Sequence, residues 1–361
     1  MKEYTDELNG MLKKQCAWLR GGDDTDIVIS SRIRLARNIN GYPFVNRASE
    51  EELKDLQDMV IREAGKVFRS SSVFYADLRS CSDLDRNFLL ERQLISKELA
   101  YSELPCAAVI DQKETFSIMI NEEDHLRIQT MVSGFELKNL WKTINKLDDR
   151  LEKVFSYAFD SKLGYLTACP SNLGTGIRVS VMLHLPGLVE TGEVEKVLQG
   201  IRTIHLTVRG LFGEGTSPLG EFFQISNQTT LGRCEEELIN EICDIVPEII
   251  EYERRAQSYL LENNHEKLLD KCFRALGILQ TARTISIEEA LEHLSSIRLG
   301  IHLKLIEDVS CSDINDLFLH IQSAHLMKKE GKRLTEDEEN IVRANCLRKQ
   351  LAPKPDKKKK L

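Results

Sequence analysis

Two arginines stand two residues apart in segment 30–34, which reads SSRIR. Alternate residues of a β-strand point to the same face, so Arg32 and Arg34 would lie side by side while Ile33 points the other way. Two guanidinium groups aligned in this manner can clamp phosphate oxygens. The alternative for this segment alone is an edge strand whose arginines only face water.

Segment 121–127, NEEDHLR, contains three consecutive acidic residues directly after an apolar run. If the chain remains extended, Glu123 and Arg127 share one face of the strand, while Glu122 and Asp124 share the other. A carboxylate beside an arginine stays ionised, which suits a general base or an acceptor for a guanidinium group. A charged surface loop is the alternative.

Two glycine-containing segments add a thiol and another carboxylate. Segment 169–178, CPSNLGTGIR, has Gly174 and Gly176 around a threonine, which suits a backbone that approaches a ligand closely. No Gly-Lys-Ser/Thr follows, so this is not a Walker A loop. Cys169 is either a reactive thiol near arginines or a buried structural cysteine. Segment 209–215, RGLFGEG, presents Glu214 from a glycine-rich turn.

These segments together indicate phosphoryl transfer. A nucleoside triphosphate needs cations around its phosphate oxygens, with Mg²⁺ bridging the phosphates, and arginines can supply that charge. Glu123 and Glu214 would then hold a cationic acceptor. A guanidinium is a poor nucleophile until it loses a proton, and paired carboxylates can fix its plane and accept that proton. The arginines available in these segments are Arg32, Arg34, Arg127, Arg178 and Arg209.

Hydrophobic periodicity predicts the elements that must position these residues. The predicted helices span residues 3–20, 49–66, 136–159 and 233–263, and the predicted strands span 27–35, 116–120, 205–209 and 222–226. Ser49 is expected to be the N-cap of the second helix. After about residue 255 the pattern becomes leucine-rich and helical, with capping boxes at Ser286–Glu289 and Thr335–Glu338.

The change in pattern predicts a mixed α and β domain followed by an all-α domain. The expected parts are an N-terminal helical segment at 1–25, a catalytic domain at 26–255, a helical C-terminal domain at 256–350 and a disordered basic tail at 351–361. The tail contains four consecutive lysines, and a nucleic-acid tether is the alternative for it.

Composition argues against several classes of protein. The 361 residues include 49 Lys and Arg against 57 Asp and Glu, and this net charge of −8 argues against a general nucleic-acid or membrane binder. No window approaches the roughly 18 apolar residues of a membrane span, and the N-terminus lacks a secretory signal. The nine cysteines form no CxxC pair, so no protein-held metal site is expected. We expect a cytoplasmic protein with reduced thiols.

In their order along the chain, SSRIR, NEEDHLR, CPSNLGTGIR and RGLFGEG resemble the phosphagen (ATP:guanidino) kinases, the superfamily of creatine and arginine kinases. The resemblance covers residues 26 to about 255. It implies an α+β fold, with a central antiparallel sheet flanked by helices and followed here by an all-α C-terminal domain. By family pattern, Glu123 would be the catalytic base, Glu214 the second guanidinium-binding carboxylate and Cys169 the thiolate beside the guanidinium.

The resemblance also implies a set of residues that contact ATP. Relatives often have histidine at the position of Gln93, which would assist the arginines. Mg²⁺ would be held mainly by the nucleotide phosphates. The implied nucleotide-binding residues are Ser30, Ser31, Arg32, Ile33, Arg34, Gln93, Arg127, Arg178, Val179, Ser180, Val181, Met182, Arg209, Gly210, Leu211, Phe212, Gly213 and Glu214.

The order of the domains resembles the bacterial protein arginine kinases, which phosphorylate arginine side chains of proteins. Metabolite kinases carry a helical domain before the arginine-bearing strand, whereas SSRIR here begins at residue 30. The resemblance implies a role in stress response, with a heat-shock repressor, a zinc-binding activator protein and a Clp unfoldase as partners, and it leaves room for a homodimer. The alternatives are a kinase for free arginine or a related metabolite, and a non-enzymatic regulatory or adaptor protein.

Similar protein arginine kinases carry a phosphoarginine pocket with the motif R-D-x-x-R-A on a C-terminal helix. The corresponding segment 339–344 reads ENIVRA, so only the last two residues match. Glu339 and Arg343 would share one helix face, which places an anion where a phosphate-binding arginine is expected. Asn340 lacks the carboxylate that would bind a guanidinium. We therefore expect weak phosphoarginine binding here, and a simple packing helix at 336–350 is the alternative.

Overall fold

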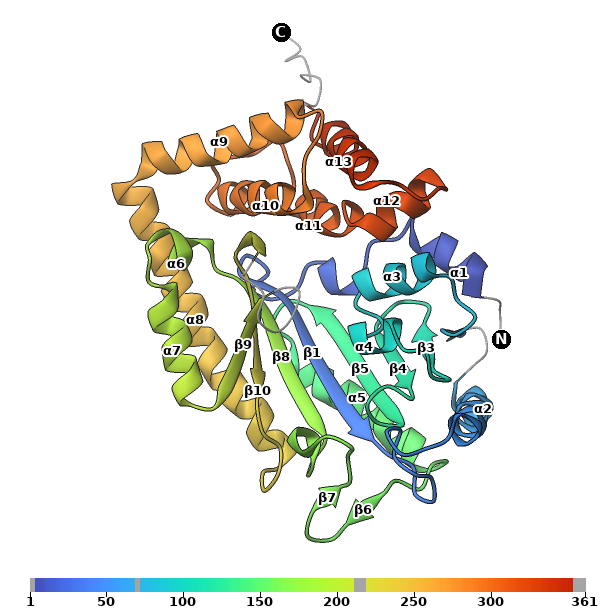
Figure 1. Cartoon of the computed structure of the whole chain (residues 1–361). Coiled ribbons are helices and arrows are strands. Elements are labelled where there is room, and N and C mark those ends of the chain that lie inside the picture. The colour runs from blue at the N-terminus through green and yellow to red at the C-terminus, as the bar shows by residue number, and fades with distance from the viewer. Residues whose placement is uncertain (1–3, 69–71, 211–218, 353–361) are drawn as a thin grey trace.

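The computed structural model describes residues 4–68, 72–210 and 219–352. Within these ranges, eight strands pair into one antiparallel sheet in the order β2-β3-β4-β5-β1-β8-β10-β9 (Figure 1). The strands of the sheet are β1 (Val28–Arg37), β2 (Val73–Asp77), β3 (Ala107–Asp111), β4 (Phe116–Ile120), β5 (Leu126–Ser133), β8 (Ile177–His184), β9 (Leu206–Gly210) and β10 (Phe222–Asn227). A separate hairpin consists of β6 (Phe159–Asp160) and β7 (Gly164–Tyr165).

Helices precede, flank and follow this sheet. Those before residue 210 are α1 (Tyr4–Met11), α2 (Glu50–Val67), α3 (Asp83–Glu91), α4 (Lys97–Ala100), α5 (Leu137–Glu152), α6 (Pro186–Glu190) and α7 (Val194–Thr203). The later ones are α8 (Glu235–Asn263), α9 (His265–Thr281), α10 (Ile287–His302), α11 (Cys311–His320), α12 (Ser323–Glu330) and α13 (Glu336–Gln350). Short 3₁₀ helices are η1 (Ala17–Leu19), η2 (Pro170–Asn172) and η3 (Leu219–Glu221).

The sheet has one face covered by helices. Ile33 and Leu35 of β1 are fully buried and belong to the same core as Leu140 and Ile144 of α5. Helix α8 adds Ile242 to this core, and Figure 1 shows α5 and α8 behind the strands. Because neighbouring strand residues alternate in direction, Arg32 and Arg34 point to the opposite face. The predicted helix-flanked antiparallel sheet is confirmed.

Capping explains where several helices begin. Ser49 accepts a hydrogen bond from the backbone of Glu52, whose side chain returns one to Ser49, so α2 begins where the sequence predicted. Thr335 and Glu338 form the same reciprocal box at α13. Ser286 caps α10 through the backbone N–H of Glu289. These local signals are short-range, and they fix helix starts independently of the tertiary fold.

Two predicted helices are shorter than expected. The first ends at Met11 instead of residue 20, because Cys16 is extended and packs with Leu19 into a small cluster against Ile29. The predicted helix 136–159 ends at Glu152, and the segment that follows forms a β-bridge between Tyr157 and Ile39. In both places burial against a distant part of the chain prevails over helical periodicity.

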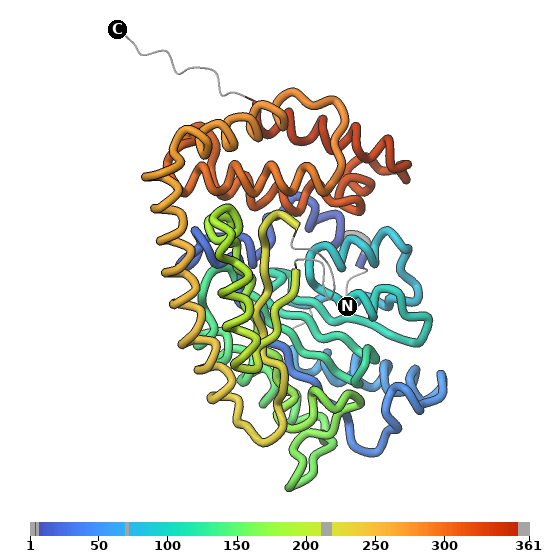
Figure 2. Tube along the Cα trace, turned by 60° about the vertical axis from the view of Figure 1, so that its left-hand side comes forward, coloured from blue at the N-terminus to red at the C-terminus, as the bar shows by residue number. Residues whose placement is uncertain are grey.

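Helices α9–α13, which lie within residues 265–350, form a helical region at one end of the sheet (Figures 1 and 2). Helix α8 passes through the predicted boundary at residue 255 without a break, and its buried residues up to Ala256 belong to the sheet core while Leu260 begins the second core. The domain limits remain a prediction. None of the described helices is both long and apolar enough to cross a membrane.

Buried contacts hold the helical region against the sheet. Arg298 of α10 donates to the backbone oxygens of Thr25, at 2.5 Å, and Asp26, at 2.9 Å, just before β1. Glu91 at the end of α3 accepts from the backbone N–H groups of Ala324 (2.7 Å) and His325 (3.0 Å) in the first turn of α12. The helical region is therefore docked on its own chain through satisfied polar groups.

Candidate active site

A cavity of about 1050 Å³ lies on the face of the sheet opposite α5. It extends from the loop between β4 and β5 to the helical region. All five arginines that the sequence singled out line it, and we call it the arginine cavity. Its polar lining residues include Ser30, Arg32, Arg34, Gln93, Glu98, Glu122, Glu123, Arg127, Gln129, Asn172, Arg178, Ser180, Arg209 and Gln224.

Strand register brings these arginines together. Arg34 of β1 lies directly opposite Arg178 of β8, and Arg32 lies opposite Ser180. On the other side of β1, Arg127 of β5 lies opposite Ala36. Residues opposite each other on one face of a sheet are about 4.5–5.5 Å apart at Cβ. The predicted alignment of Arg32 and Arg34 on one face, with Ile33 in the core, is confirmed.

Arg32 is held by neutral side chains. Its Nη1 donates to Oε1 of Gln93 at 3.1 Å and its Nη2 donates to Oε1 of Gln224 at 2.6 Å. Gln93 has a positive φ of 61°, and its backbone oxygen accepts from Nε2 of Gln129 at 2.6 Å. Amide oxygens orient the guanidinium without cancelling its charge, which leaves that charge for a ligand.

The arginine cavity concentrates positive charge away from water. Burial, together with the charges of Arg127, Arg178 and Arg209, lowers the pKa of Arg32 to about 9. Burial and the neighbouring arginines also lower the pKa of Arg34, whose buried Nε has no hydrogen-bond partner among the described residues. Gathering like charges and leaving a buried donor unpaired are both costly. A bound polyanion would relieve both costs.

The chain does not remain extended through the acidic residues of segment 121–127, so the alternative of a loop holds at this place. Asn121 adopts a left-handed φ of 57°, and β5 begins only at Leu126. The side-chain N–H groups of Asn121 donate to the backbone oxygens of Leu53 and Pro105, both at 2.8 Å. Asparagine tolerates this backbone conformation better than most residues. The three acids therefore lie in a tight turn rather than alternating across a sheet.

The turn separates the acids by environment. Arg127 donates a hydrogen bond to the buried carboxylate of Glu122. Burial disfavours the charged form of both side chains, but their mutual attraction outweighs it. The pKa of Arg127 is therefore raised and the pKa of Glu122 is lowered. Glu123 is exposed at the cavity entrance, where its Oε2 accepts from Nδ2 of Asn172 at 3.5 Å. The pKa of Glu123 is raised, mainly because the carboxyl is partly buried and also because Asp124 and Glu122 are negatively charged. A raised pKa suits a group that must accept a proton.

The loop that follows β7 brings Cys169 to the same entrance. Its Sγ lies 3.0 Å from the hydroxyl of Ser171, and Cys169 is close enough to Glu123 to act against the rise in the pKa of that carboxyl. Cys169 is partly exposed and is therefore not a buried structural cysteine. The backbone N–H of Ala168 donates to Asp124 at 2.7 Å, which ties this loop to the acidic turn.

The two glycines of this loop approach protein backbone rather than open space. Gly174 has a φ of 110°, and a Cβ placed on it would lie 2.9 Å from the Cα of Leu231. A Cβ on Gly176 would lie 2.6 Å from the backbone oxygen of Ala36. Both glycines thus approach protein backbone closely, and Gly176 also lines the arginine cavity, where an approach to a ligand stays a prediction. These glycines fix the loop against β1 and the segment after β10.

Several residues of the predicted nucleotide-binding set do not point into the cavity. Ile33, Val179 and Val181 are fully buried in the core on the opposite face. The hydroxyl of Ser31 donates to the backbone oxygen of Gly134 at 2.8 Å on that same face. Such residues could reach a ligand only through their backbone. Leu211, Phe212, Gly213 and Glu214 lie outside the described residues.

Sequence inspection missed part of the lining. Gln129 and Met131 follow Arg127 at intervals of two on β5, so strand alternation could have identified them. Gln224 of β10 is opposite Met182 and could have been found in the same way. No sequence signal pointed to the helical region, whose contribution depends on how the chain folds back.

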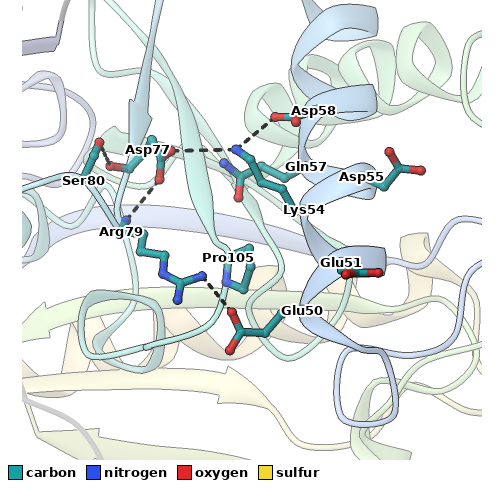
Figure 3. Close-up of a pocket in the computed structure, with 10 residues that line it drawn as sticks. All are labelled: Glu50, Glu51, Lys54, Asp55, Gln57, Asp58, Asp77, Arg79, Ser80 and Pro105. Atoms are coloured by element: carbon teal, nitrogen blue, oxygen red, sulfur yellow. Dashed lines mark hydrogen bonds and ion pairs between the residues drawn. The ribbon is translucent and has the colours of Figure 1, made fainter.

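A second cavity, of about 660 Å³, lies between α2 and the turn after β2 (Figure 3). Lys54 bridges Asp58 at 3.1 Å and Asp77 at 4.0 Å, and Arg79 pairs with Glu50 at 2.9 Å. Its acids are thus partly neutralised by cations from the same cavity, as Figure 3 shows. Within the described residues, no group of three or more His, Cys, Asp or Glu side chains could hold a metal ion.

The C-terminal segment 339–344 uses its arginine internally. Arg343 is almost fully buried, and it donates to the backbone oxygens of Ile321 and Ile285, both at 3.0 Å. Glu339 lies 3.5 Å from Nη2 of Arg343, so the predicted shared helix face is confirmed. The guanidinium of Arg343 is thereby occupied by the protein's own acceptors.

Known proteins match the chain in two parts. Residues 55–256 match the family described as "ATP:guanido phosphotransferase, C-terminal catalytic domain", and residues 265–360 match "Protein-arginine kinase McsB C-terminal domain". The protein-arginine kinase of Brevibacillus brevis is 42% identical over 339 residues, which cover 92% of this chain and 94% of that protein. The protein-arginine kinase of Clostridium novyi is 43% identical over 332 residues, covering 90% and 95%.

Solved structures of related kinases share the sheet and its helices. Lombricine kinase superposes with a TM-score of 0.58 and 26% identity, covering 66% of this chain and 70% of that one. The duplicated taurocyamine kinase from Schistosoma mansoni with bound transition state analog components gives a TM-score of 0.58 and 26% identity, covering 70% of this chain and 36% of that one. The α+β phosphagen-kinase fold that the resemblance implied is confirmed. With both parts matched along nearly its whole length, the chain belongs to the protein-arginine kinases of the ATP:guanido phosphotransferase superfamily.

Proposed function

We propose that the arginine cavity holds the phosphates of ATP and that an arginine side chain of a protein substrate enters at the end formed by Glu123 and Cys169. As a protein-arginine kinase, the chain is an ATP-dependent phosphotransferase that acts on guanidinium groups of proteins. One observation carries the assignment of the phosphate site: Arg32 and Arg34 are partly buried beside other arginines, and the buried Nε of Arg34 has no hydrogen-bond partner among the described residues.

Each side chain has a role in this proposal. Arg32, Arg34 and their neighbours neutralise the phosphate oxygens and keep the γ-phosphorus in line with the incoming nitrogen. Glu123 accepts the proton that the guanidinium loses as the new N–P bond forms. The bond from the γ-phosphorus to the bridging oxygen breaks at the same time, and ADP leaves with the electron pair. Glu214, from outside the described residues, would hold the other edge of the guanidinium.

Cys169 lies in reach of the same substrate group. Its Sγ is 3.0 Å from the hydroxyl of Ser171, and Cys169 influences the pKa of Glu123, which supports a position of the sulfur beside the proposed base. In the proposal, the sulfur faces the guanidinium and helps to orient it for attack. Mg²⁺, when bound with the nucleotide, would neutralise phosphate charge, and the nucleotide itself would provide most of its ligands.

The biological setting is likewise a proposal. We propose a cytoplasmic enzyme of the bacterial stress response, with a heat-shock repressor among its substrates, a zinc-binding protein as activator and a Clp unfoldase that recognises the product. Its support is the resemblance to bacterial protein arginine kinases. Homodimer formation belongs to the same proposal.

Substitution of Arg34 tests the phosphate site. Loss of a charge-assisted contact costs about 1.5–3 kcal/mol, so Arg34→Met should weaken binding of both ATP and inorganic triphosphate by roughly 10-fold or more. Arg62 on the exposed face of α2 provides the matched control, and Arg62→Met should bind both ligands as the native chain does. Calorimetric titration of the full chain measures this. Unchanged triphosphate affinity in Arg34→Met would refute the assignment.

A further inference from the structure

The arginine cavity continues past the arginines to the helical region. Asn315, Phe318 and Leu319 of α11, and Gln322 just after it, line this far part together with Trp18 and Leu19 of η1. Their spacing of three and four residues places the α11 side chains on one helix face. The catalytic-domain match ends at residue 256, so this wall comes from a part of the chain outside that domain.

Strand register gives the direction of the cavity. Along β1 the cavity-facing residues are Arg34, then Arg32, then Ser30, each one about 6.6 Å further toward the helical region. Ser30 lies opposite Met182 of β8, and Met182 lies opposite Gln224 of β10. Beyond Arg32, the lining that these strands provide consists of Ser30, Met182 and Gln224, which carry no charge.

Aromatic and aliphatic groups form the far wall. The ring of Phe318 packs edge-on against Phe222, with centroids 4.8 Å apart. Leu319 is buried in a cluster with Phe222 and Ile29, and Trp18 and Met182 pack on this cluster. A flat heteroaromatic ring has an apolar face and a polar edge, and surfaces of this composition accept such rings.

One polar group of the wall keeps an open acceptor. The side-chain Nε2 of Gln322 donates to the backbone oxygen of Phe318 at 3.0 Å, which fixes the amide. Among the described residues, nothing donates to its Oε1. An acceptor held at the edge of this apolar wall would accept a hydrogen bond from an exocyclic amino group of a base. Adenine carries such a group, whereas guanine has no amino group at the same ring position.

The wall is fixed in place by its own docking contacts. The indole N–H of Trp18 donates to the backbone oxygen of Arg92 at 3.2 Å. Arg92 forms a buried ion pair with Glu114, in which Nε lies 2.8 Å from Oε2 and Nη2 lies 2.7 Å from Oε1. The residue after Arg92 is Gln93, which orients Arg32. The segment that binds the helical region through Glu91 therefore also positions the phosphate site.

We propose that the helical region supplies one wall of the nucleotide-base site, with Phe318 against the ring and Gln322 at its amino edge. This proposal rests on the placement of the phosphates at the arginines. It assigns the helical region a direct part in nucleotide recognition and in the preference for ATP over GTP. Docking of the helical region and binding of the base are then coupled, because the base site is complete only when the helical region is docked.

Base-dependent binding by the full chain tests the proposal. Gln322→Ala should weaken ATP binding roughly 3- to 10-fold and reduce the preference for ATP over GTP, while inorganic triphosphate binds unchanged. Phe318→Leu should also weaken ATP more than triphosphate. The matched control is Gln280→Ala, which removes a similar amide bond, to the backbone oxygen of Leu351, elsewhere in the helical region. Native ATP affinity and base preference in both Gln322→Ala and Phe318→Leu would overturn the proposal.

Fluorescence gives a second readout that does not depend on those variants. Trp141 lies on α5, on the other face of the sheet, so Trp141→Phe leaves Trp18 as the reporter. ATP should change the emission of Trp18 and inorganic triphosphate should not. Equal responses to the two ligands would overturn the base site. If triphosphate fails to compete with ATP at all, the phosphate assignment itself is wrong and the base site is refuted with it.

Discussion

Arg127 donates its hydrogen bond to Glu122, the residue directly before the proposed base, and not to Glu123. The Glu122 side chain is only 2% exposed, whereas Glu123 lies at the cavity entrance. Two adjacent carboxylates thus have different environments because Asn121 turns the chain between β4 and β5. Glu122 balances a buried arginine, and Glu123 remains available to the substrate.

Removal of the proposed base should affect chemistry and spare nucleotide binding. Glu123→Gln and Glu214→Gln are each expected to lower the phosphorylation rate by ~10²–10⁴, because we propose that each carboxylate acts on the guanidinium. ATP affinity should stay near that of the native chain. Glu103→Gln, an exposed acid that does not line the cavity, is the control. Single-turnover kinetics and ATP titration measure the two quantities, and equal loss of ATP affinity in both variants would contradict these roles.

Alkylation should identify Cys169 as the thiol at the substrate entrance. We expect limiting iodoacetamide to label Cys169 first, and the labelling to slow when ATP and a protein substrate are both present. Cys234 is more exposed but lies away from the cavity, so its labelling should not respond to these ligands. Peptide mass spectrometry quantifies both sites. Preferential labelling of Cys16 or Cys346, or the absence of protection at Cys169, would count against its position beside the guanidinium.

Local signals were enough to predict much of the fold. Alternation identified β1, an apolar run identified β4, and the capping residues Ser49 and Thr335 located two helix starts. The end of α5 could not be predicted, since it depends on the bridge between Tyr157 and Ile39. Hydrophobic periodicity reflects the secondary-structure preference of a short segment, whereas a β-bridge such as this one depends on residues far away in the chain.

The candidate site was predictable to a similar extent. Residue type and spacing identified the arginines and Glu123, and strand register then brought them to one face. The pairing of Arg127 with Glu122 was missed because a single left-handed residue, Asn121, changes the direction of the chain. The wall containing Phe318 was missed because nothing in the sequence indicates that the helical region folds back onto the cavity.

The buried carboxyl of Glu253 should make stability depend on pH. It accepts hydrogen bonds from the backbone of Gly187 (2.7 Å) and Leu188 (2.9 Å) and from Gln257 (2.7 Å), yet burial outweighs them and raises its pKa to about 7. A raised folded pKa adds stability that is complete below the unfolded pKa near 4.5 and is lost as the pH rises through 7.

The free energy of unfolding of the native chain should therefore fall relative to that of Glu253→Gln as the pH rises from 5 to 7. The expected slope is at most about 1.4 kcal/mol per pH unit. Urea unfolding of both chains at several pH values measures it. A constant difference across this range would show that Glu253 does not carry the raised pKa.

Phosphoarginine should not activate this kinase through the C-terminal helix. Arg343 is occupied by backbone oxygens, and Glu339 would repel a phosphate. Initial rates are therefore expected to stay constant as free phosphoarginine is added to the full chain. The double variant Glu339→Arg, Asn340→Asp restores the motif of similar kinases and is the chain in which binding should appear. Activation of the native chain that Arg343→Lys removes would show that a functional pocket persists.

The most direct measurement is to offer the full chain ATP and Mg²⁺ with two acceptors in parallel, free arginine and a casein-like protein. Phosphate bound to arginine through nitrogen is labile in acid, so products are analysed by mass spectrometry without acid treatment. We predict phosphoarginine on the protein, none from free arginine, and loss of the product in Glu123→Gln. Consumption of free arginine, or a product that persists unchanged in Glu123→Gln, would contradict the account.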